Sequence, residues 1–223
     1  MLIKAVLFDL DNTLHVEEPC HQAGLEAVFQ AVEPDFKLDR AEFFKRYHEA
    51  RVVVGKRLLT QAAGRSQLLY FQYFFEQLEG RTLIAESLTA SGIYWDAYME
   101  AMILRPGILE ALRLLKKCGV VCVLVSDMLS ELQMEKLLRL ELQDYFAFVV
   151  TSEESGADQP SPQSIQLALD KLQIKNPEGV IFVGDAHDRN ATAADHFDLS
   201  FVKVVSDQDS QNLTATLQHF LGR

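Results

Sequence analysis

The sequence predicts an α/β fold in which a doubly wound, mainly parallel sheet is interrupted by a long helical insertion. Two observations support this prediction. Short apolar runs rich in β-branched residues alternate with amphipathic helical patterns, which is typical of buried parallel strands joined by right-handed βαβ crossovers. One long stretch, residues 17–104, contains helical patterns but no convincing buried strand.

The strands are expected where the apolar runs occur. These runs cover residues 3–10, 120–125, 146–150, 180–183 and 201–205. Three of the runs end directly in polar side chains, which matters because ligands of open α/β sheets bind outside the carboxyl ends of the strands.

Helical patterns fill the gaps between the later strands. They cover residues 108–117, 129–140, 164–172, 190–196 and 212–221. Pro106 marks the return of the chain from the insertion to the sheet, because proline disfavours helix at the preceding residue. We therefore expect an α/β core of residues 1–16 and 105–223, and a helical domain of residues 17–104, which has the size of a small domain.

Composition excludes several classes of protein. With 48% apolar and 24% charged residues, the 223-residue chain can bury a core. Its net charge of −11 argues against a protein that binds the phosphate backbone of nucleic acids or the surface of an anionic membrane. Lys4, Asp9 and Asp11 interrupt the N-terminal apolar run, which excludes a signal peptide. Three cysteines without CxxC spacing predict free thiols, and together these features predict a soluble cytoplasmic protein.

Acids and a hydroxyl follow the predicted strands. Asp9 and Asp11 stand at i and i+2, so their side chains leave the extended chain on one side while the Leu10 carbonyl can turn toward them. Ser126 and Asp185 follow two further strands. Carboxylates and a carbonyl are hard oxygen ligands that suit Mg²⁺, and without a cation the pKa values of such buried acids rise. We therefore expect Mg²⁺ held by Asp9, Asp11 and Asp185.

Four ordered segments resemble the motifs of the haloacid dehalogenase-like hydrolase superfamily. The segments read FDLDNTL at 8–14, VSD at 125–127, SEESGADQPSPQSI at 152–165 and IFVGDAHDRN at 181–190. The resemblance covers the predicted core and implies a Rossmann-like sheet. It also implies that the helical insertion is a cap that excludes water and shapes the choice of substrate.

The resemblance assigns roles to individual positions. It implies that Asp9 is the nucleophile that forms an aspartyl-phosphate. Asp11 falls on the general acid, with a pKa that we expect burial and the neighbouring carboxylate to raise. The family's dehalogenases lack an acid at this second position, so Asp11 indicates phosphate esters. Ser126, Asp127 and Gln159 fall on phosphate-binding positions.

Two positions depart from the family's pattern. Gln159 replaces the lysine that precedes Pro-x-Pro, a change that by analogy with a lost preorganised donor costs about 10²–10³ in rate. In the fourth motif Arg189 and Asn190 replace the usual second acid, and Asp188 lies at +3. Asn190 can still bond a metal-bound water, and a hypothesis is that Arg189 supplies the missing positive charge. We expect Asp188, Arg189 and Asn190 to surround the metal site.

The sequence therefore predicts Mg²⁺-dependent hydrolysis of a small phosphorylated metabolite, of the nucleotide or sugar phosphate type. Three alternatives remain open. The substitutions at 159 and 190 are compatible with a catalytically weak or inactive relative that binds phosphate or a partner. Phosphate mutases share the first motif. A receiver-like signalling domain also groups acids at strand ends, although it needs no helical insertion and usually carries the lysine that is absent here.

Overall fold

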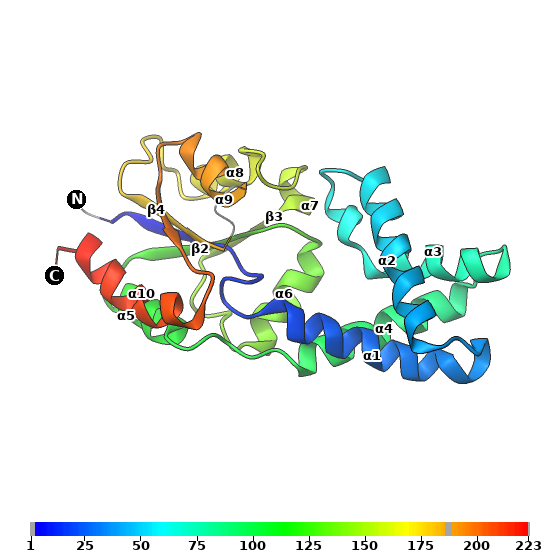
Figure 1. The fold of residues 1–223 in the computed structure, drawn as a ribbon. Helices are drawn as coiled ribbons and strands as arrows, with labels where there is room; N and C mark the ends of the chain where they lie inside the picture. Colours follow the sequence, from blue (N-terminus) through cyan, green and yellow to red (C-terminus); the bar gives the residue numbers. More distant parts are fainter. Residues whose placement is uncertain (1–2, 186–188, 223) are drawn as a thin grey trace. The chain divides into compact units, whose positions relative to one another are not determined.

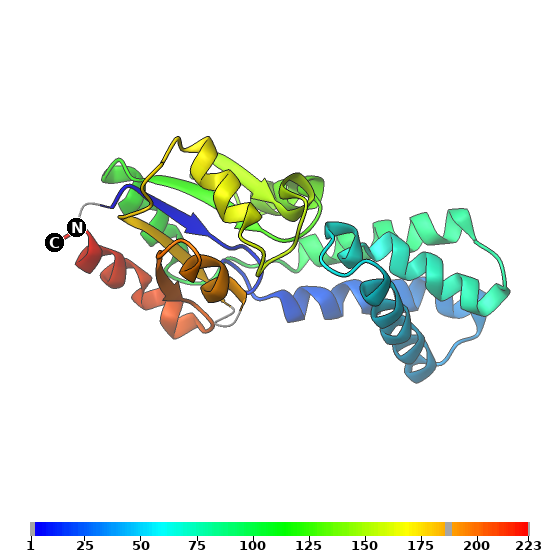
Figure 2. The same cartoon turned by 90° about the horizontal axis from the view of Figure 1, so that it is seen from above.

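The computed structural model describes residues 3–185 and 189–222. The described chain divides into two compact units. The first, formed by Met1–Val16 and Ile103–Arg223, contains the sheet and is called the α/β unit here. The second, Glu17–Met102, consists of helices and is called the helical unit (Figures 1 and 2).

A parallel sheet forms the centre of the α/β unit. Its strands in the described chain are β1 (Ala5–Phe8), β2 (Val121–Ser126), β3 (Phe148–Thr151), β4 (Val180–Gly184) and β5 (Ser200–Lys203). They lie in the order β3-β2-β1-β4-β5, and all neighbours are parallel. The predicted doubly wound α/β fold with a helical insertion is confirmed.

The register of the strands determines where a site can form. Phe8, the last residue of β1, lies opposite Leu124 of β2 and Val183 of β4. The strand order runs outward from β1 to β3 and then reverses to β4 and β5 on the other side of β1. This reversal is the topological switch point at which open α/β sheets bind ligands.

The helices of the α/β unit lie close to the predicted ranges. In the described chain they are α5 (Ile108–Lys117), α6 (Ser130–Arg139), α7 (Ser152–Ser155), α8 (Gln163–Lys171), α9 (Arg189–Asp195) and α10 (Asp207–Phe220). The start of α10 lies five residues before the expected one. Ser206 and Asp209 form a reciprocal capping box that satisfies the first N–H groups of this helix and so fixes its start.

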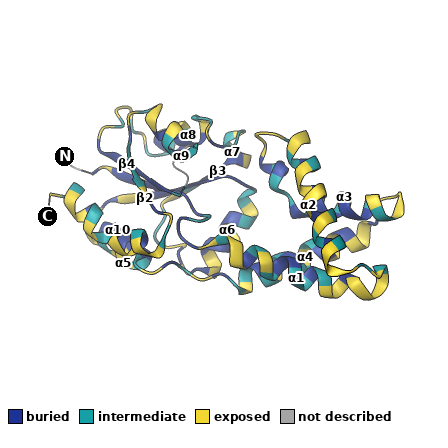
Figure 3. Cartoon of the chain, viewed as in Figure 1, coloured by how far each residue is buried: buried dark blue, intermediate teal, exposed yellow. Residues whose placement is uncertain are grey.

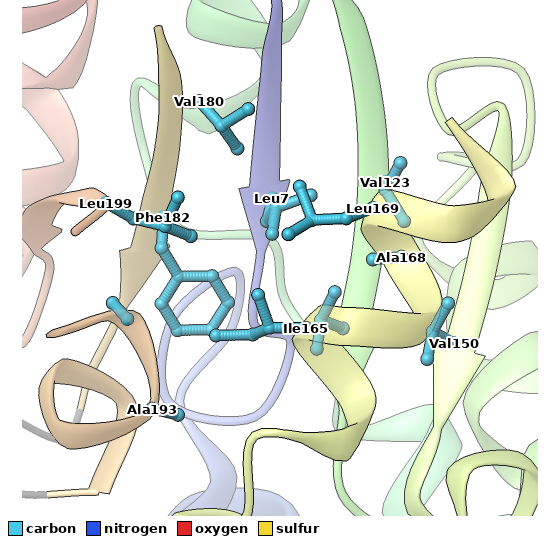
Figure 4. Close-up of a cluster of buried hydrophobic side chains, with 12 residues drawn as sticks. Leu7, Val123, Val150, Ile165, Ala168, Leu169, Val180, Phe182, Ala193 and Leu199 are labelled. Carbon is cyan, nitrogen blue, oxygen red and sulfur yellow. The ribbon is translucent and has the colours of Figure 1, made fainter. Parts of the chain in front are cut away.

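The sheet is covered on both faces. Helices α8 and α9 lie over one face and α5 and α10 over the other (Figure 1). Figure 4 shows the core beneath α8 and α9, where Leu7, Phe182 and Ile165 pack together without measurable exposure. Burial explains why the strands read as continuous apolar runs, while the helices expose their outer faces (Figure 3).

The helical unit has an aromatic core of its own. Its described helices are α1 (Glu17–Phe36), α2 (Arg40–Arg57), the short 3₁₀ helix η1 (Ala62–Arg65), α3 (Gln67–Glu79) and α4 (Ile84–Glu100). Phe71, Phe74 and Phe75 of α3 are buried on the apolar face of this helix. Across the described residues, no helix combines the length and apolarity needed to cross a bilayer.

Candidate active site

Asp9 lies directly after β1 at the switch point of the sheet. Its backbone N–H donates to the Val183 carbonyl at 2.9 Å, which places Asp9 beside the end of β4. The residue is only 8% exposed. Its Oδ2 accepts hydrogen bonds from Asn190 Nδ2 at 3.1 Å and from Thr13 Oγ1 at 3.4 Å. The carboxylate is therefore oriented by side chains from two separate segments.

Asn190 joins Asp9 to Asp185. The same Nδ2 lies 3.4 Å from Asp185 Oδ1, so one amide group donates toward both carboxylates. This approach requires glycine at position 184, because a Cβ there would collide with the Asn190 side chain. The fold therefore places Asn190 beside Asp9 and Asp185, two of the acids expected at the metal site.

The electrostatic state of Asp9 follows from this crowding. Burial raises its pKa well above the usual range, and the negative charges of Asp185 and Asp11 raise it further. Hydrogen bonds from the Leu10 N–H and from Asn190 oppose this shift only in part. A cation beside Asp9 would therefore favour its ionised form.

Asp11 lies in a different environment. Its Oδ1 accepts from Lys136 Nζ at 2.6 Å and from His15 Nε2 at 2.9 Å, and its Oδ2 accepts from Gln133 Nε2 at 3.0 Å. Burial alone would raise the pKa of Asp11, but the Lys136 charge and the His15 contact hold it well below its usual range. The expectation of a raised pKa at Asp11 is wrong for this state of the site, because a buried cation faces the carboxylate.

Lys136 and Gln133 were not among the residues expected at the site. Both come from α6 and are 1% and 0% exposed, respectively. They lie at i and i+3 beside the buried Leu137, so the inward face of this helix carries polar groups. The signal that was available in the sequence is a lysine three residues after a glutamine in a helix predicted to cover the sheet.

His15, which follows the first motif, is buried. Its backbone forms isolated bridges with Asp11 and Leu104, which fix the chain where it leaves and re-enters the α/β unit. The side chain has no measurable exposure and contacts Asp11.

Ser126, expected at a phosphate-binding position, ends β2 and is 1% exposed. Its Oγ accepts from Gln133 Nε2 at 3.1 Å, so one glutamine connects Ser126 to Asp11. The backbone N–H groups of Met128 and Ser130, in the turn after β2, have acceptors within the protein. Met128 N donates to Ser152 Oγ and Ser130 N to the Glu153 carboxylate, both at 2.8 Å.

Asp127, Gln159 and Arg189 form one polar network. The Gln159 N–H donates to Asp127 Oδ1 at 2.8 Å, and Arg189 pairs with Asp127 Oδ2. Arg189 Nε also donates to the Gln159 carbonyl at 3.2 Å. Both the Asp127 carboxylate and the Arg189 guanidinium thus have partners within the protein. Their contacts join the loop after β2 to the loop that contains Gln159. Within the described residues, Gln159 Oε1 is buried without a hydrogen-bond partner.

Two of the oxygen groups expected to bind Mg²⁺ have hydrogen-bond partners within the protein. The Leu10 carbonyl accepts backbone hydrogen bonds from Thr13 and Leu14, and the Asp11 carboxylate accepts from Lys136. Accordingly, the described residues contain no group of three His, Cys, Asp or Glu side chains arranged for a metal. Asp9 and Asp185 remain as a carboxylate pair that fits Mg²⁺, which typically binds one or two carboxylates with water and phosphate oxygens. Asp188 lies outside the described residues.

Comparison with known proteins identifies the type of enzyme that this site resembles. The family model described as haloacid dehalogenase-like hydrolase matches residues 3–198. The chain is 34% identical over 207 residues to ribulose-1,5-bisphosphate 5-phosphatase of Halopiger xanaduensis, which covers 92% of this chain and 86% of that protein. It is 28% identical over 207 residues to glyceraldehyde 3-phosphate phosphatase of Methanopyrus kandleri, which covers 91% and 84%.

Solved structures share the fold. A 2-haloacid dehalogenase from Pseudomonas syringae superposes with a TM-score of 0.77 at 19% identity, over 100% of this chain and 99% of that chain. A HAD phosphatase from Thermococcus onnurineus gives a TM-score of 0.66 at 22% identity, over 90% and 86%. At these identities the similarity concerns the arrangement of the elements.

Proposed function

The chain belongs to the haloacid dehalogenase-like hydrolases, and from this membership and the geometry of its site we propose that it dephosphorylates a small sugar phosphate through phosphorylated Asp9. The observation that carries the proposal is the contrast between two neighbouring acids. Asp9 has a raised pKa beside Asp185, whereas Asp11 has a lowered pKa beside Lys136. Carboxyl groups in such opposite environments are suited to different chemical roles.

The substrate class rests on the named relatives. Two proteins that match most of this chain are called phosphatases of ribulose 1,5-bisphosphate and of glyceraldehyde 3-phosphate. Both names describe phosphate esters of small sugars. We therefore favour a sugar phosphate over the nucleotide that the sequence motifs left open.

In the proposed first step, an Asp9 oxygen attacks phosphorus and the bond from phosphorus to the sugar oxygen breaks. Asn190 and Thr13 orient the attacking carboxylate through its Oδ2. The leaving sugar oxygen takes a proton from Asp11. The lowered pKa of Asp11 favours its carboxylate form in the free site. The nearby charge of a bound phosphate would raise this pKa, so that Asp11 takes up a proton from solvent before the sugar oxygen leaves.

In the proposed second step, water attacks phosphorus and the bond from phosphorus to Asp9 breaks. Asp11, now a carboxylate, accepts a proton from the attacking water. When inorganic phosphate leaves, the pKa of Asp11 falls again and this proton passes to solvent, which restores the carboxylate for the next cycle. Mg²⁺ bound by Asp9 and Asp185 would neutralise charge and orient the phosphate.

The three cysteines are free thiols, which supports the expected reducing, cytoplasmic location.

The proposal is tested by measuring phosphate release from a panel of sugar phosphates and nucleotides with Mg²⁺. We expect the wild-type chain to prefer sugar phosphates and Asp9→Asn to lose turnover on every one of them. Asp195→Asn is a matched control, because it removes an equivalent charge from an exposed position at the end of α9. Turnover by Asp9→Asn comparable with that of the control would overturn the mechanism.

A further inference from the structure

The inward face of α6 presents a buried ammonium group to Asp11. Lys136 is 1% exposed, and its Nζ lies 2.6 Å from Asp11 Oδ1 and 3.8 Å from Met128 Sδ. A lysine is rarely buried to this extent unless its charge is paired. The contact with Asp11 supplies the paired charge that allows Lys136 to be buried.

The contacts around Asp11 restrain both of its oxygens. Lys136 and His15 bind Oδ1, and Gln133 binds Oδ2 from the other side. Donors on both oxygens fix the rotation of a carboxyl group, and Oδ2, which accepts from Gln133, keeps a second lone pair for a further partner. The direction in which Asp11 faces is thus set largely by one face of α6.

Arg189, the basic residue expected to supply positive charge to the site, has other partners. Arg189 pairs with Asp127 and with the Gln159 carbonyl. Position 159 carries Gln in place of the lysine of the family's motif, and its backbone N–H also binds Asp127. Lys136 is consequently the buried ammonium group that contacts one of the two proposed catalytic acids.

We propose that Lys136 is the positioning residue of Asp11, fixing the carboxyl group in the orientation from which it exchanges protons with the leaving sugar oxygen and with water. This inference rests on the proposed function. Lys136 acts through Asp11 rather than on the phosphate, so its loss should mimic loss of the proton donor.

The test compares two substrates that differ in their need for a proton. A sugar alkoxide must be protonated as it leaves, whereas the p-nitrophenolate ion leaves without a proton. The ratio kcat/KM reports the reaction through departure of this group, before water attacks. The sugar phosphate is glyceraldehyde 3-phosphate or ribulose 1,5-bisphosphate, whichever the wild-type chain hydrolyses faster.

We expect Lys136→Met to lower kcat/KM for the sugar phosphate by about 10–100-fold, part of the 10²–10⁴-fold that general acids contribute. The value for p-nitrophenyl phosphate should change less than about threefold, since its first step needs no acid. Lys136→Arg should recover part of the loss. Equal losses on both substrates would place Lys136 on the phosphate and overturn the inference.

A second comparison does not require Lys136→Met to fold by itself. Asp11→Asn already lacks the acid, and the double variant Asp11→Asn/Lys136→Met contains a neutral pair in place of the ion pair. We expect the two to have the same kcat/KM for p-nitrophenyl phosphate. A further loss above about tenfold in the double variant contradicts positioning, since about 1.4 kcal/mol of transition-state stabilisation would then come from Lys136 directly. A wild-type chain that hydrolyses neither substrate contradicts the proposed function instead.

Discussion

Lys136 Nζ lies 2.6 Å from Asp11 Oδ1, and the two residues are 125 positions apart in the sequence. The contact joins α6 to the segment that follows β1. It also joins a residue that no sequence motif identifies to one that stands in the most recognisable motif of the chain. Stability and catalysis should therefore both depend on this pair.

The first prediction concerns the free energy of unfolding. Lys136→Met should lower it by about 2–3 kcal/mol, somewhat less than the 3–5 kcal/mol typical of a broken buried pair, because Asp11 keeps two other donors. Adding Asp11→Asn should restore most of the loss, because no unpaired charge remains. Urea unfolding monitored by circular dichroism measures both values. If the double variant is less stable than Lys136→Met, the ion pair is not the source of the effect.

The second prediction concerns Asp9 without metal. Its folded-state pKa is raised by burial, then by Asp185 and Asp11. A raised carboxyl pKa contributes stability that is present below the unfolded pKa and is lost as the pH rises through the folded pKa. At pH 7 in EDTA, Asp9→Asn should therefore melt at a higher temperature than wild type, each kcal/mol giving about 2–4 °C in Tm for a chain of this size.

The pH dependence provides the control for this second prediction. At acidic pH, where Asp9 is protonated in wild type, the difference in Tm between wild type and Asp9→Asn should shrink. Asp11 behaves oppositely, because its lowered pKa contributes stability that is lost only as the pH falls through that low value. A lower Tm for Asp9→Asn at pH 7 would show that Asp9 is already compensated by charge within the protein.

Sequence reasoning located the strands of this fold and most of the helices of the α/β unit. The runs that became β1, β2 and β4 are buried almost throughout, so apolar composition alone marks them. The apolar pattern was misleading within α6. Met134 and Leu138 are 50% and 61% exposed there, while Gln133 and Lys136 face inward.

The site was predictable only in part, for a related reason. Asp9 and Asp185 follow β1 and β4, and Ser126 ends β2. Parallel strands bring their carboxyl ends to one edge of the sheet. The state of Asp11 depends instead on a lysine that reaches it from a helix, which strand-end logic does not reveal. The Leu10 carbonyl was expected to turn toward the acids, but Thr13 and Leu14 occupy it in the turn after β1.

The third prediction concerns Mg²⁺. Binding by Asp9 and Asp185 should raise the Tm of the wild-type chain, since a ligand at 100 times its Kd stabilises by about 2.7 kcal/mol. Asp185→Asn should respond only at much higher Mg²⁺ concentrations. Glu135→Gln, an equal change of charge at an exposed position of α6, should respond as wild type does. An identical Mg²⁺ response in Asp185→Asn and Glu135→Gln would place the cation elsewhere.

The fourth prediction concerns Arg189. Its guanidinium joins Asp127 to the Gln159 carbonyl and is 43% exposed, so it holds two loops together at the edge of the site. Arg189→Ala should lower kcat/KM less than tenfold and the free energy of unfolding by no more than about 1 kcal/mol, as for a partly exposed pair. Steady-state kinetics and urea unfolding measure these effects. A loss of about 10²-fold or more would instead support the hypothesis that Arg189 compensates for Gln159 on the phosphate.

Trapping the phosphoryl group on the protein tests whether Asp9 is the residue that carries it. Asp11→Asn should react with p-nitrophenyl phosphate in the first step, because that step needs no acid. The phosphorylated form of the variant should then accumulate, because Asp11 no longer activates the attacking water. Acid quenching followed by mass spectrometry of peptides should show a phosphate mass on the peptide containing Asp9, and none when Asp9→Asn is added. An Asp11→Asn chain that releases a burst of p-nitrophenol without any phosphorylated peptide would show that Asp9 does not carry the phosphoryl group.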